Sequence, residues 1–123
     1  QPRFGFKSRG LGDVYKRQTR GFAGCFDGFV TELADHWLAA REDIDTDEIE
    51  IFACGPTPML KAVVNLAQKH KVANQISLEE YMACAVGGCA GCTVLTETDD
   101  GQKMQRVCVD GPVFDGNSVI FQI

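Results

Sequence analysis

The first regular pattern of apolar and polar positions begins at Phe29 and runs to about Arg41. Its apolar residues recur at helical spacing and are Phe29, Val30, Leu33, Ala34, Trp37 and Leu38. Apolar positions three and four residues apart predict one buried face of an amphipathic helix. We therefore expect a helix here, with Trp37 in the core. His36 lies off the apolar face, and we assign it no function.

A strand, a tight turn and a second helix are predicted next. Residues 49–53 are β-rich and mostly apolar, which is typical of a strand buried in a parallel sheet. Gly55-Pro56 interrupts this strand, and Thr57-Pro58 predicts a helix start, with threonine as the N-cap and proline as the first helical residue. A 3.6-residue apolar stripe then extends to about Lys71. Such a unit favours an anion at the helix N-terminus, although the chain has no Gly-x-Gly-x-x-Gly motif.

The last third of the chain predicts short strands separated by turns. Residues 76–78 and 93–98 read as strands, and Asp99-Asp-Gly101 reads as a hairpin turn that leads into a returning strand at 103–107. Residues 119–121 predict a short closing strand. The acidic connector at 42–48 lacks the glycine and final glutamate of an EF-hand loop, so we interpret it as a solvent-facing turn.

Four cysteines in this region have the spacing of a metal cluster site. They read Cys-x4-Cys-x2-Cys, followed by a fourth after fifteen residues, and are Cys84, Cys89, Cys92 and Cys108. The first part of this spacing is that of plant-type [2Fe–2S] ligation. Small residues separate the thiols, so the backbone can wrap closely around two irons, and glycines allow positive φ angles. The predicted hairpin brings Cys108 back to the loop; Cys25 and Cys54 are expected not to be ligands.

Two other uses of these cysteines compete with a cluster. Structural zinc also takes four thiolates, but zinc ribbons use two Cys-x2-Cys pairs, and here only Cys89 and Cys92 form one. A disulfide framework is typical of secreted chains, and nothing in this sequence resembles a signal peptide. The spacing therefore favours the cluster over zinc, and zinc over disulfides.

Composition and charge separate the first eighteen residues from the rest. The chain has 123 residues, 45% of them apolar, and no apolar run of the length that a membrane-spanning helix requires. Residues 1–18 carry five basic side chains against one acidic, whereas the remainder carries seven against sixteen. Residues 10–18 resemble translated sequencing adapter, and we expect residues 1–18 to be non-native and without function. The acidic remainder argues against nucleic acid and anionic membranes as partners.

Two blocks of sequence resemble a known family of flavin and iron–sulfur proteins. The run Ala53-Cys-Gly-Pro-Thr-Pro-Met-Leu60 resembles the Cys-Gly-Pro turn of the ferredoxin reductase-like NAD(P) domain. Ser77-Leu-Glu-Glu-Tyr-Met-Ala-Cys84 through Cys92, with Arg106-Val-Cys-Val-Asp-Gly-Pro-Val-Phe114, resembles the iron–sulfur domain of the electron-transfer subunits of type B dihydroorotate dehydrogenases. The resemblance covers nearly all of residues 19–114.

The resemblance implies a fold, cofactors and a partner. The fold is α/β plus a small β-rich domain: residues 19–75 as the C-terminal part of an NAD-binding domain, and residues 76–123 as a [2Fe–2S] domain. It implies NAD contacts at the turn, namely Cys54, Gly55, Pro56, Thr57 and Met59. The family also has an FAD-binding barrel that is missing here, so the chain is expected to be a piece of the subunit, and FAD is carried onto no residue.

The function implied is an electron relay in pyrimidine biosynthesis. Electrons would pass from dihydroorotate through the FMN of a catalytic partner subunit, across the cluster to FAD, and end on NAD as hydride. The cluster loop would face that partner, in a cytoplasmic hetero-oligomer with no catalytic residue in this chain. Two alternatives stay open: a subunit of a related reductase, of the sulfide dehydrogenase or ferredoxin:NADP oxidoreductase type, and a zinc-stabilised binding module.

Overall fold

The computed structural model of the chain describes residues 26, 28–41 and 45–121. The expectations for residues 1–18 and for Cys25 lie outside these residues, as do residues 42–44 of the predicted acidic connector. The described elements are, in chain order, α1 (Val30–Ala39), a 3-10 turn (Thr46–Glu48), β1 (Glu50–Cys54), α2 (Thr57–His70), β2 (Ala73–Ser77), β3 (Thr93–Thr98), β4 (Gly101–Arg106), α3 (Val107–Asp110), β5 (Val113–Asp115), a second 3-10 turn (Gly116–Ser118) and β6 (Val119–Ile120).

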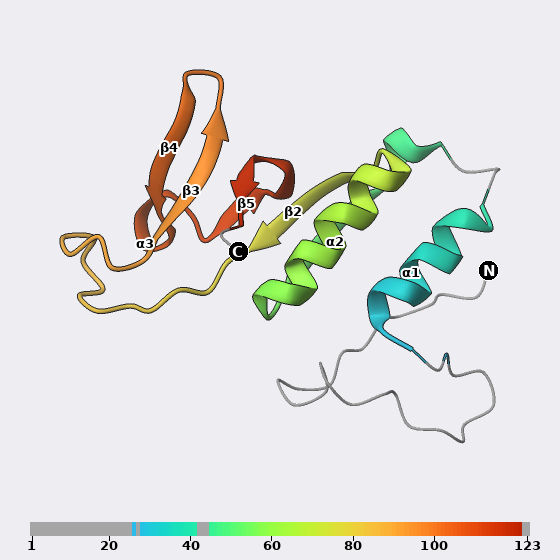
Figure 1. The fold of residues 1–123 in the computed structure, drawn as a ribbon, viewed down its shortest axis with the longest axis horizontal. Coiled ribbons are helices and arrows are strands. Elements are labelled where there is room, and N and C mark those ends of the chain that lie inside the picture. The colour runs from blue at the N-terminus through green and yellow to red at the C-terminus, as the bar shows by residue number, and fades with distance from the viewer. Residues whose placement is uncertain (1–25, 27, 42–44, 122–123) are drawn as a thin grey trace.

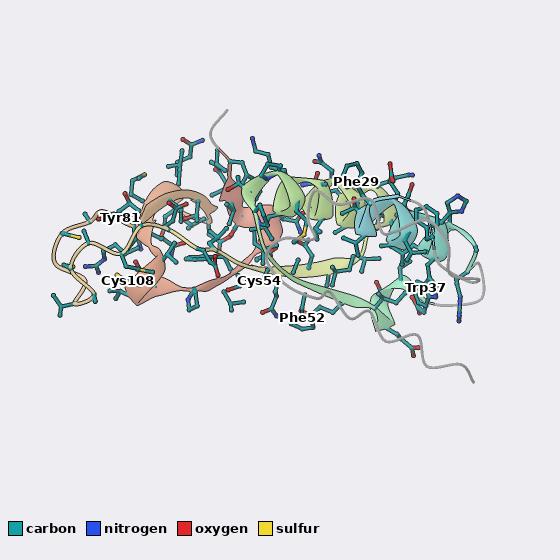
Figure 2. The ribbon with its side chains drawn as sticks, turned by 90° about the horizontal axis from the view of Figure 1, so that it is seen from below. Phe29, Trp37, Phe52, Cys54, Tyr81 and Cys108 are labelled. Carbon is teal, nitrogen blue, oxygen red and sulfur yellow. The ribbon has the colours of Figure 1, made fainter. Side chains whose placement is uncertain are left out.

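The first sheet combines strands from distant parts of the chain in the order β1-β2-β5. β1 and β2 are parallel and are joined by α2, whereas β5 returns antiparallel to β2. Both helices lie on one side of this sheet, and Phe52 points away from them on the other side (Figure 2). Phe52 is 69% exposed, so this face of the sheet is open in the described part of the chain.

The start of α2 differs from the prediction by one residue. Pro56 is the N-cap, Thr57 is the first helical residue, and no side chain caps the helix. The carbonyl of Pro56 accepts the first helical hydrogen bonds, from the N–H groups of Met59 and Leu60 at 2.9 and 3.1 Å. The fixed φ of proline already suits a helix start, so the threonine cap was not needed and its prediction was wrong. The predicted end is confirmed, since Lys71 is the C-cap with φ of 56°.

α1 packs beside α2 without entering the core (Figure 1). It has no buried residue, and Phe29 and Val30 at its start are 61% and 45% exposed. Trp37 is half-buried with the Arg41 guanidinium over its ring at 4.7 Å, so the prediction of a core tryptophan was wrong. The apolar face of α1 packs against α2 and does not enter the central core.

The second sheet is the β3–β4 hairpin with β6 added on the free side of β3. The predicted hairpin is confirmed, with register from Thr98↔Gly101 to Thr93↔Arg106. The two sheets share one core, whose buried members are Leu60, Val64, Ile76, Leu78, Cys92, Val107 and Phe114. β5 pairs with β2, so the first sheet contains residues from both of the predicted segments, 19–75 and 76–123. No helix in the described part of the chain is long and apolar enough to cross a membrane.

Candidate metal centre

The segment that carries three of the predicted thiols runs from Leu78 to Cys92, between β2 and β3, and we call it the cysteine loop. It contains no helix or strand and projects from one end of the molecule, beside the hairpin (Figure 1). Its two ends are fixed by backbone hydrogen bonds. The N–H of Leu78 donates to the carbonyl of Pro112 at 2.9 Å, and the N–H of Val107 donates to the carbonyl of Cys92 at 3.0 Å.

Cys92 and Cys108 form the first pair of thiols. Cys92 directly precedes β3, and Cys108 lies in α3 directly after β4, so the hairpin brings them together as the sequence predicted. Their Sγ atoms are 3.2 Å apart, which is a thiol–thiol contact longer than a disulfide bond. Cys92 is 2% exposed and belongs to the core, which anchors this side of the site.

Cys84 and Cys89 form the second pair, within the loop. The Cys84 sulfur accepts a hydrogen bond from the backbone N–H of Val86, and further bonds from the Cys89 thiol and the N–H groups of Cys89 and Gly88. These donors lower the pKa of Cys84 to about 6. The Gly91 N–H donates to the Cys89 Sγ at 3.3 Å. The backbone therefore already stabilises negative charge on this pair, as thiolate ligands of a cluster require.

The two pairs are close enough to influence one another. A backbone hydrogen bond from Cys108, followed by one from its thiol, lowers the pKa of Cys92. The same thiol contact, burial, and the charges of Cys92 and Cys84 raise the pKa of Cys108. The charge of Cys84 therefore acts on Cys108, which links the two pairs electrostatically. Cys84, Cys89, Cys92 and Cys108 all have free thiols.

The backbone of the loop bends inward at three positive φ angles. Gly87 has φ of 76°, but the other two are taken by alanines, Ala85 at 55° and Ala90 at 54°. The sequence led us to expect glycine at such positions, yet Gly88 and Gly91 do not adopt them. Each of these three residues directly precedes a residue whose N–H is directed at a cysteine sulfur, namely Val86, Gly88 and Gly91.

The donor set is that of a thiolate-ligated centre, because it consists of four free cysteines. Among the described residues, no group of three or more His, Cys, Asp or Glu side chains is gathered closely enough to hold a metal ion. Soft sulfur ligands with inward N–H donors suit iron–sulfur chemistry.

The residues predicted for NAD lie at the carboxyl end of β1 and the start of α2. Cys54 is exposed, and its register partner across the sheet is Ser77, the residue directly before the cysteine loop. Met59 folds back so that its methyl group lies over Gly55, and it packs against the core. The predicted turn therefore adjoins the cysteine loop, with Pro56 and Thr57 at the helix N-terminus.

Sequence reasoning missed two features of the site. The Arg106 side chain donates to the carbonyl of Gly87 at 2.8 Å and so joins β4 to the loop. Four large apolar side chains on the cysteine loop and α3 are also exposed: Tyr81, Met82, Val86 and Val109. Figure 2 shows Tyr81 and Cys108 at the same end of the molecule. The only signal for either feature was the conspicuous Tyr-Met and Arg-Val-Cys blocks that flank the cysteines.

Comparison with known proteins matches both parts of the chain. Residues 79–120 match the family described as the iron–sulfur cluster binding domain of dihydroorotate dehydrogenase B. The chain is 40% identical over 115 residues to the dihydroorotate dehydrogenase B (NAD(+)) electron transfer subunit of Caldanaerobacter subterraneus, which covers 94% of the chain and 43% of that protein. The same subunit from Shouchella clausii is 36% identical over 110 residues, covering 89% of the chain and 39% of the relative.

A solved structure shows the same fold. It is described as an NADH-dependent reduced ferredoxin-NADP oxidoreductase, studied for flavin-based electron bifurcation. It is 29% identical with a TM-score of 0.61, covering 75% of this chain and 30% of the other. The chain spans about two-fifths of the length of the curated relatives it matches. Mixed α/β structure with small sheets is thereby confirmed.

Proposed function

We propose that the paired thiols of this chain hold one [2Fe–2S] cluster. The premise is that the chain belongs, through residues 79–120, to the iron–sulfur cluster binding domain family of dihydroorotate dehydrogenase B. The four ligands are Cys84, Cys89, Cys92 and Cys108. The observation that carries this proposal is the 3.2 Å contact between the Cys92 and Cys108 sulfurs, which brings the fourth thiol from the far side of the hairpin to the end of the cysteine loop.

The pairing assigns a role to each segment. We infer that Cys84 and Cys89 hold one iron, and that Cys92 and Cys108 hold the other. When bound, such a cluster supplies reversible one-electron transfer. The backbone N–H groups of Val86 and Gly88, which already donate to Cys84, stabilise the negative charge on that side. The buried Cys92 holds the opposite side rigidly against the core.

The whole protein is proposed to be an electron-transfer subunit of an NAD-dependent dihydroorotate dehydrogenase. Two electrons from dihydroorotate would pass through the FMN of a catalytic subunit to FAD and then, with a proton, to NAD⁺ in pyrimidine biosynthesis. The names and identities of the relatives support this role, and a cytoplasmic location goes with it. Residues 19–75 would complete an NAD-binding domain and residues 76–123 the cluster domain. FAD is assigned to no residue of this chain.

A partial NAD site is proposed at the turn between β1 and α2. Its residues are Cys54, Gly55, Pro56, Thr57 and Met59. The N-terminus of α2 offers N–H groups to an anion, and Cys54 is exposed beside it. A nucleotide crevice needs the ends of several parallel strands, and β1 and β2 are the only parallel pair in the described residues. We therefore expect this chain by itself to bind NAD weakly in calorimetry.

The cysteine loop is proposed to face the catalytic subunit. A one-electron site is useful only when a second redox centre comes close, and Val86 and Tyr81 on this loop are 84% and 81% exposed. Exposed apolar residues gathered around a site are typical of a protein interface. The small residues between the thiols add little thickness over the cluster, so a partner could approach closely.

Anaerobic reconstitution of the 123-residue chain with iron and sulfide tests the proposed cluster. We expect a red-brown protein with about two irons per chain, because ferric thiolate clusters absorb visible light. A colourless protein that takes up zinc in preference to iron would instead support the zinc-stabilised binding module.

A second candidate is a related ferredoxin-linked reductase, which the solved structure at 29% identity favours. Dihydroorotate:NAD and reduced ferredoxin:NADP assays, made with a complete subunit and its partner, separate the two. Turnover with ferredoxin and none with dihydroorotate would overturn the first assignment.

A further inference from the structure

We propose that Arg106 is a positioning residue that clamps the middle of the cysteine loop against the segment carrying Cys108. This inference rests on the proposed function, because the clamp is proposed to fix the position of one thiol pair relative to the other, and both pairs hold the proposed cluster. Arg106 itself touches no thiol in the described contacts; it acts through the loop backbone.

The first contact of the clamp is a hydrogen bond. The Arg106 Nη1 donates to the carbonyl of Gly87 at 2.8 Å in a partly buried position. Gly87 lies midway between Cys84 and Cys89, and Arg106 is the last residue of β4, two positions before Cys108. A hydrogen bond from a charged donor is among the stronger kinds, and partial burial strengthens it further.

The second contact is direct packing of the loop backbone on α3. A Cβ placed on Gly87 would lie 2.6 Å from the Cγ2 of Val109, so only glycine allows this approach. Its φ of 76° also favours glycine. Val109 follows Cys108 directly, so the loop touches α3 beside the fourth thiol. The carbonyl contact and the packing contact thus fall on the same loop residue.

A third interaction orients the arginine. The Arg106 backbone N–H donates to the Oδ2 of Asp110 at 2.7 Å, and its Nε lies 3.7 Å from the same oxygen. This carboxylate partly balances the guanidinium charge and holds the side chain along α3. The planar fork of arginine lets one edge face Asp110 while the other reaches Gly87, which the single ammonium group of lysine cannot do equally.

The hydrogen bond from Arg106 fixes the middle of the cysteine loop. Backbone hydrogen bonds fix its ends at Leu78 and Cys92. Between positions 79 and 89, the Arg106–Gly87 bond is the one described hydrogen bond that reaches another element. Without it, the Cys84–Cys89 pair could move relative to the Cys92–Cys108 pair. Arg106 therefore sets the distance between the two halves of the site.

The test compares Arg106→Gln and Arg106→Lys with wild type and with Lys103→Gln, which removes a positive charge from an exposed position on the same strand. After reconstitution, iron release to a chelator is timed, and the electron paramagnetic resonance spectrum of the reduced protein is recorded. We expect Arg106→Gln to release iron about tenfold faster, the size of effect typical of residues that support metal ligands. The spectrum of Arg106→Gln should shift from that of wild type. The iron-release rate of Arg106→Lys should lie between those of wild type and Arg106→Gln, and Lys103→Gln should match wild type in both measurements.

Hydrogen exchange on the metal-free chain separates failure of the clamp from failure of the proposed cluster. Amides at 83–88 should exchange faster in Arg106→Gln than in wild type, whether or not a cluster can be loaded. Wild-type exchange, together with a wild-type release rate and spectrum, would overturn the clamp. A wild type that takes up no cluster would overturn the proposed function, and the exchange result alone would then decide the clamp. Arg106→Met, which keeps the aliphatic stem, replaces Arg106→Gln if circular dichroism shows that the latter does not fold.

Discussion

Asn74, on β2, has a buried side chain that packs closely against Gly116. Its side chain is 3% exposed, and neither its amide nitrogen nor its oxygen has a hydrogen-bond partner among the described residues. The backbone of Gly116 lies directly against the amide oxygen, and a methyl group of Val64 also lies close to the Gly116 backbone. The buried amide costs free energy, because no hydrogen bond offsets its desolvation.

We predict that Gly116→Ala destabilises the chain. The added Cβ would overlap the Asn74 Oδ1 and come within 2.9 Å of the Val64 Cγ2. Overpacking of this kind typically lowers the free energy of unfolding by about 1–3 kcal/mol. Urea unfolding of the metal-free chain measures the change.

Gly88→Ala is the matched control, because a Cβ at Gly88 has no atom within 4 Å, and it should unfold like wild type. Adding Asn74→Ala to Gly116→Ala should recover part of the loss by removing the overlapping oxygen. Equal stability of Gly116→Ala and Gly88→Ala would contradict the packing described here.

Residue roles were predictable where spacing alone determines them. The four thiols could be grouped from the sequence because the Cys-x4-Cys-x2-Cys pattern and a single hairpin bring them together. Arg106 could not be assigned, since its partner Gly87 lies nineteen residues away and the contact is made to a backbone carbonyl. Nor could the positive φ of Ala85 and Ala90 be foreseen, because alanine adopts it only under constraint from the loop.

An ion cluster joins α1 to α2. Both carboxylate oxygens of Asp35 accept hydrogen bonds from the Lys69 Nζ at 2.8 Å, and Oδ1 lies 2.6 Å from the His70 Nε2. α1 itself has no buried residue. The bond from His70, then that from Lys69, lowers the pKa of Asp35 below its usual 3.8.

We predict that Asp35→Asn lowers the thermal midpoint of the metal-free chain slightly at pH 7. A carboxyl whose pKa is lower in the folded state stabilises the fold above its unfolded pKa, and this contribution disappears as pH falls through the folded value. The difference between wild type and Asp35→Asn should therefore be largest above about pH 4 and vanish at lower pH. A difference that grew on acidification would show that Asp35 acts in another way.

Helices and strands were largely predictable, whereas their burial was not. Period and turn residues located α2, β3 and β4 within about two residues, which is the usual uncertainty of element ends. The stripe in α1 was taken for a core face, but it lies against another helix near the surface and leaves Trp37 half-buried. Periodicity indicates which face is apolar; it does not indicate how much protein covers that face.

At the scale of the whole molecule, the two sheets share one core through Leu78, Val107 and Phe114. β5 joins the first sheet although it follows the β3–β4 hairpin of the second sheet in the chain, so the cluster segment is connected to the β1–α2–β2 unit. The sequence could not predict this pairing, because a three-residue strand has no periodicity of its own. The result places the cysteine loop at one end of an elongated molecule and α1 toward the other (Figure 1).

We predict that Val86→Glu, placed in a complete electron-transfer subunit, weakens binding of the catalytic subunit by about tenfold or more, the effect of losing one interface anchor. Val86 is 84% exposed beside the thiols, so a charge there would be buried in the proposed interface. Visible absorbance should stay at the wild-type level. Binding is measured by titration of the partner, and dihydroorotate:NAD turnover should fall with it.

Val30→Glu is the control for this variant, since Val30 is also exposed but lies on α1, away from the cysteine loop. It should bind the partner as wild type does. If both variants bind and turn over normally, the cysteine loop is not the docking surface.

The most direct test of the central claim is the iron content and visible spectrum of single serine variants after reconstitution. Serine at position 84, 89, 92 or 108 should leave a protein that loses most of its colour, because each thiol supplies one of the four cluster ligands. Cys54→Ser should remain as brown as wild type, since Cys54 lies exposed at the end of β1 and outside both thiol pairs. A fully loaded, brown Cys108→Ser protein would contradict the four-thiol site.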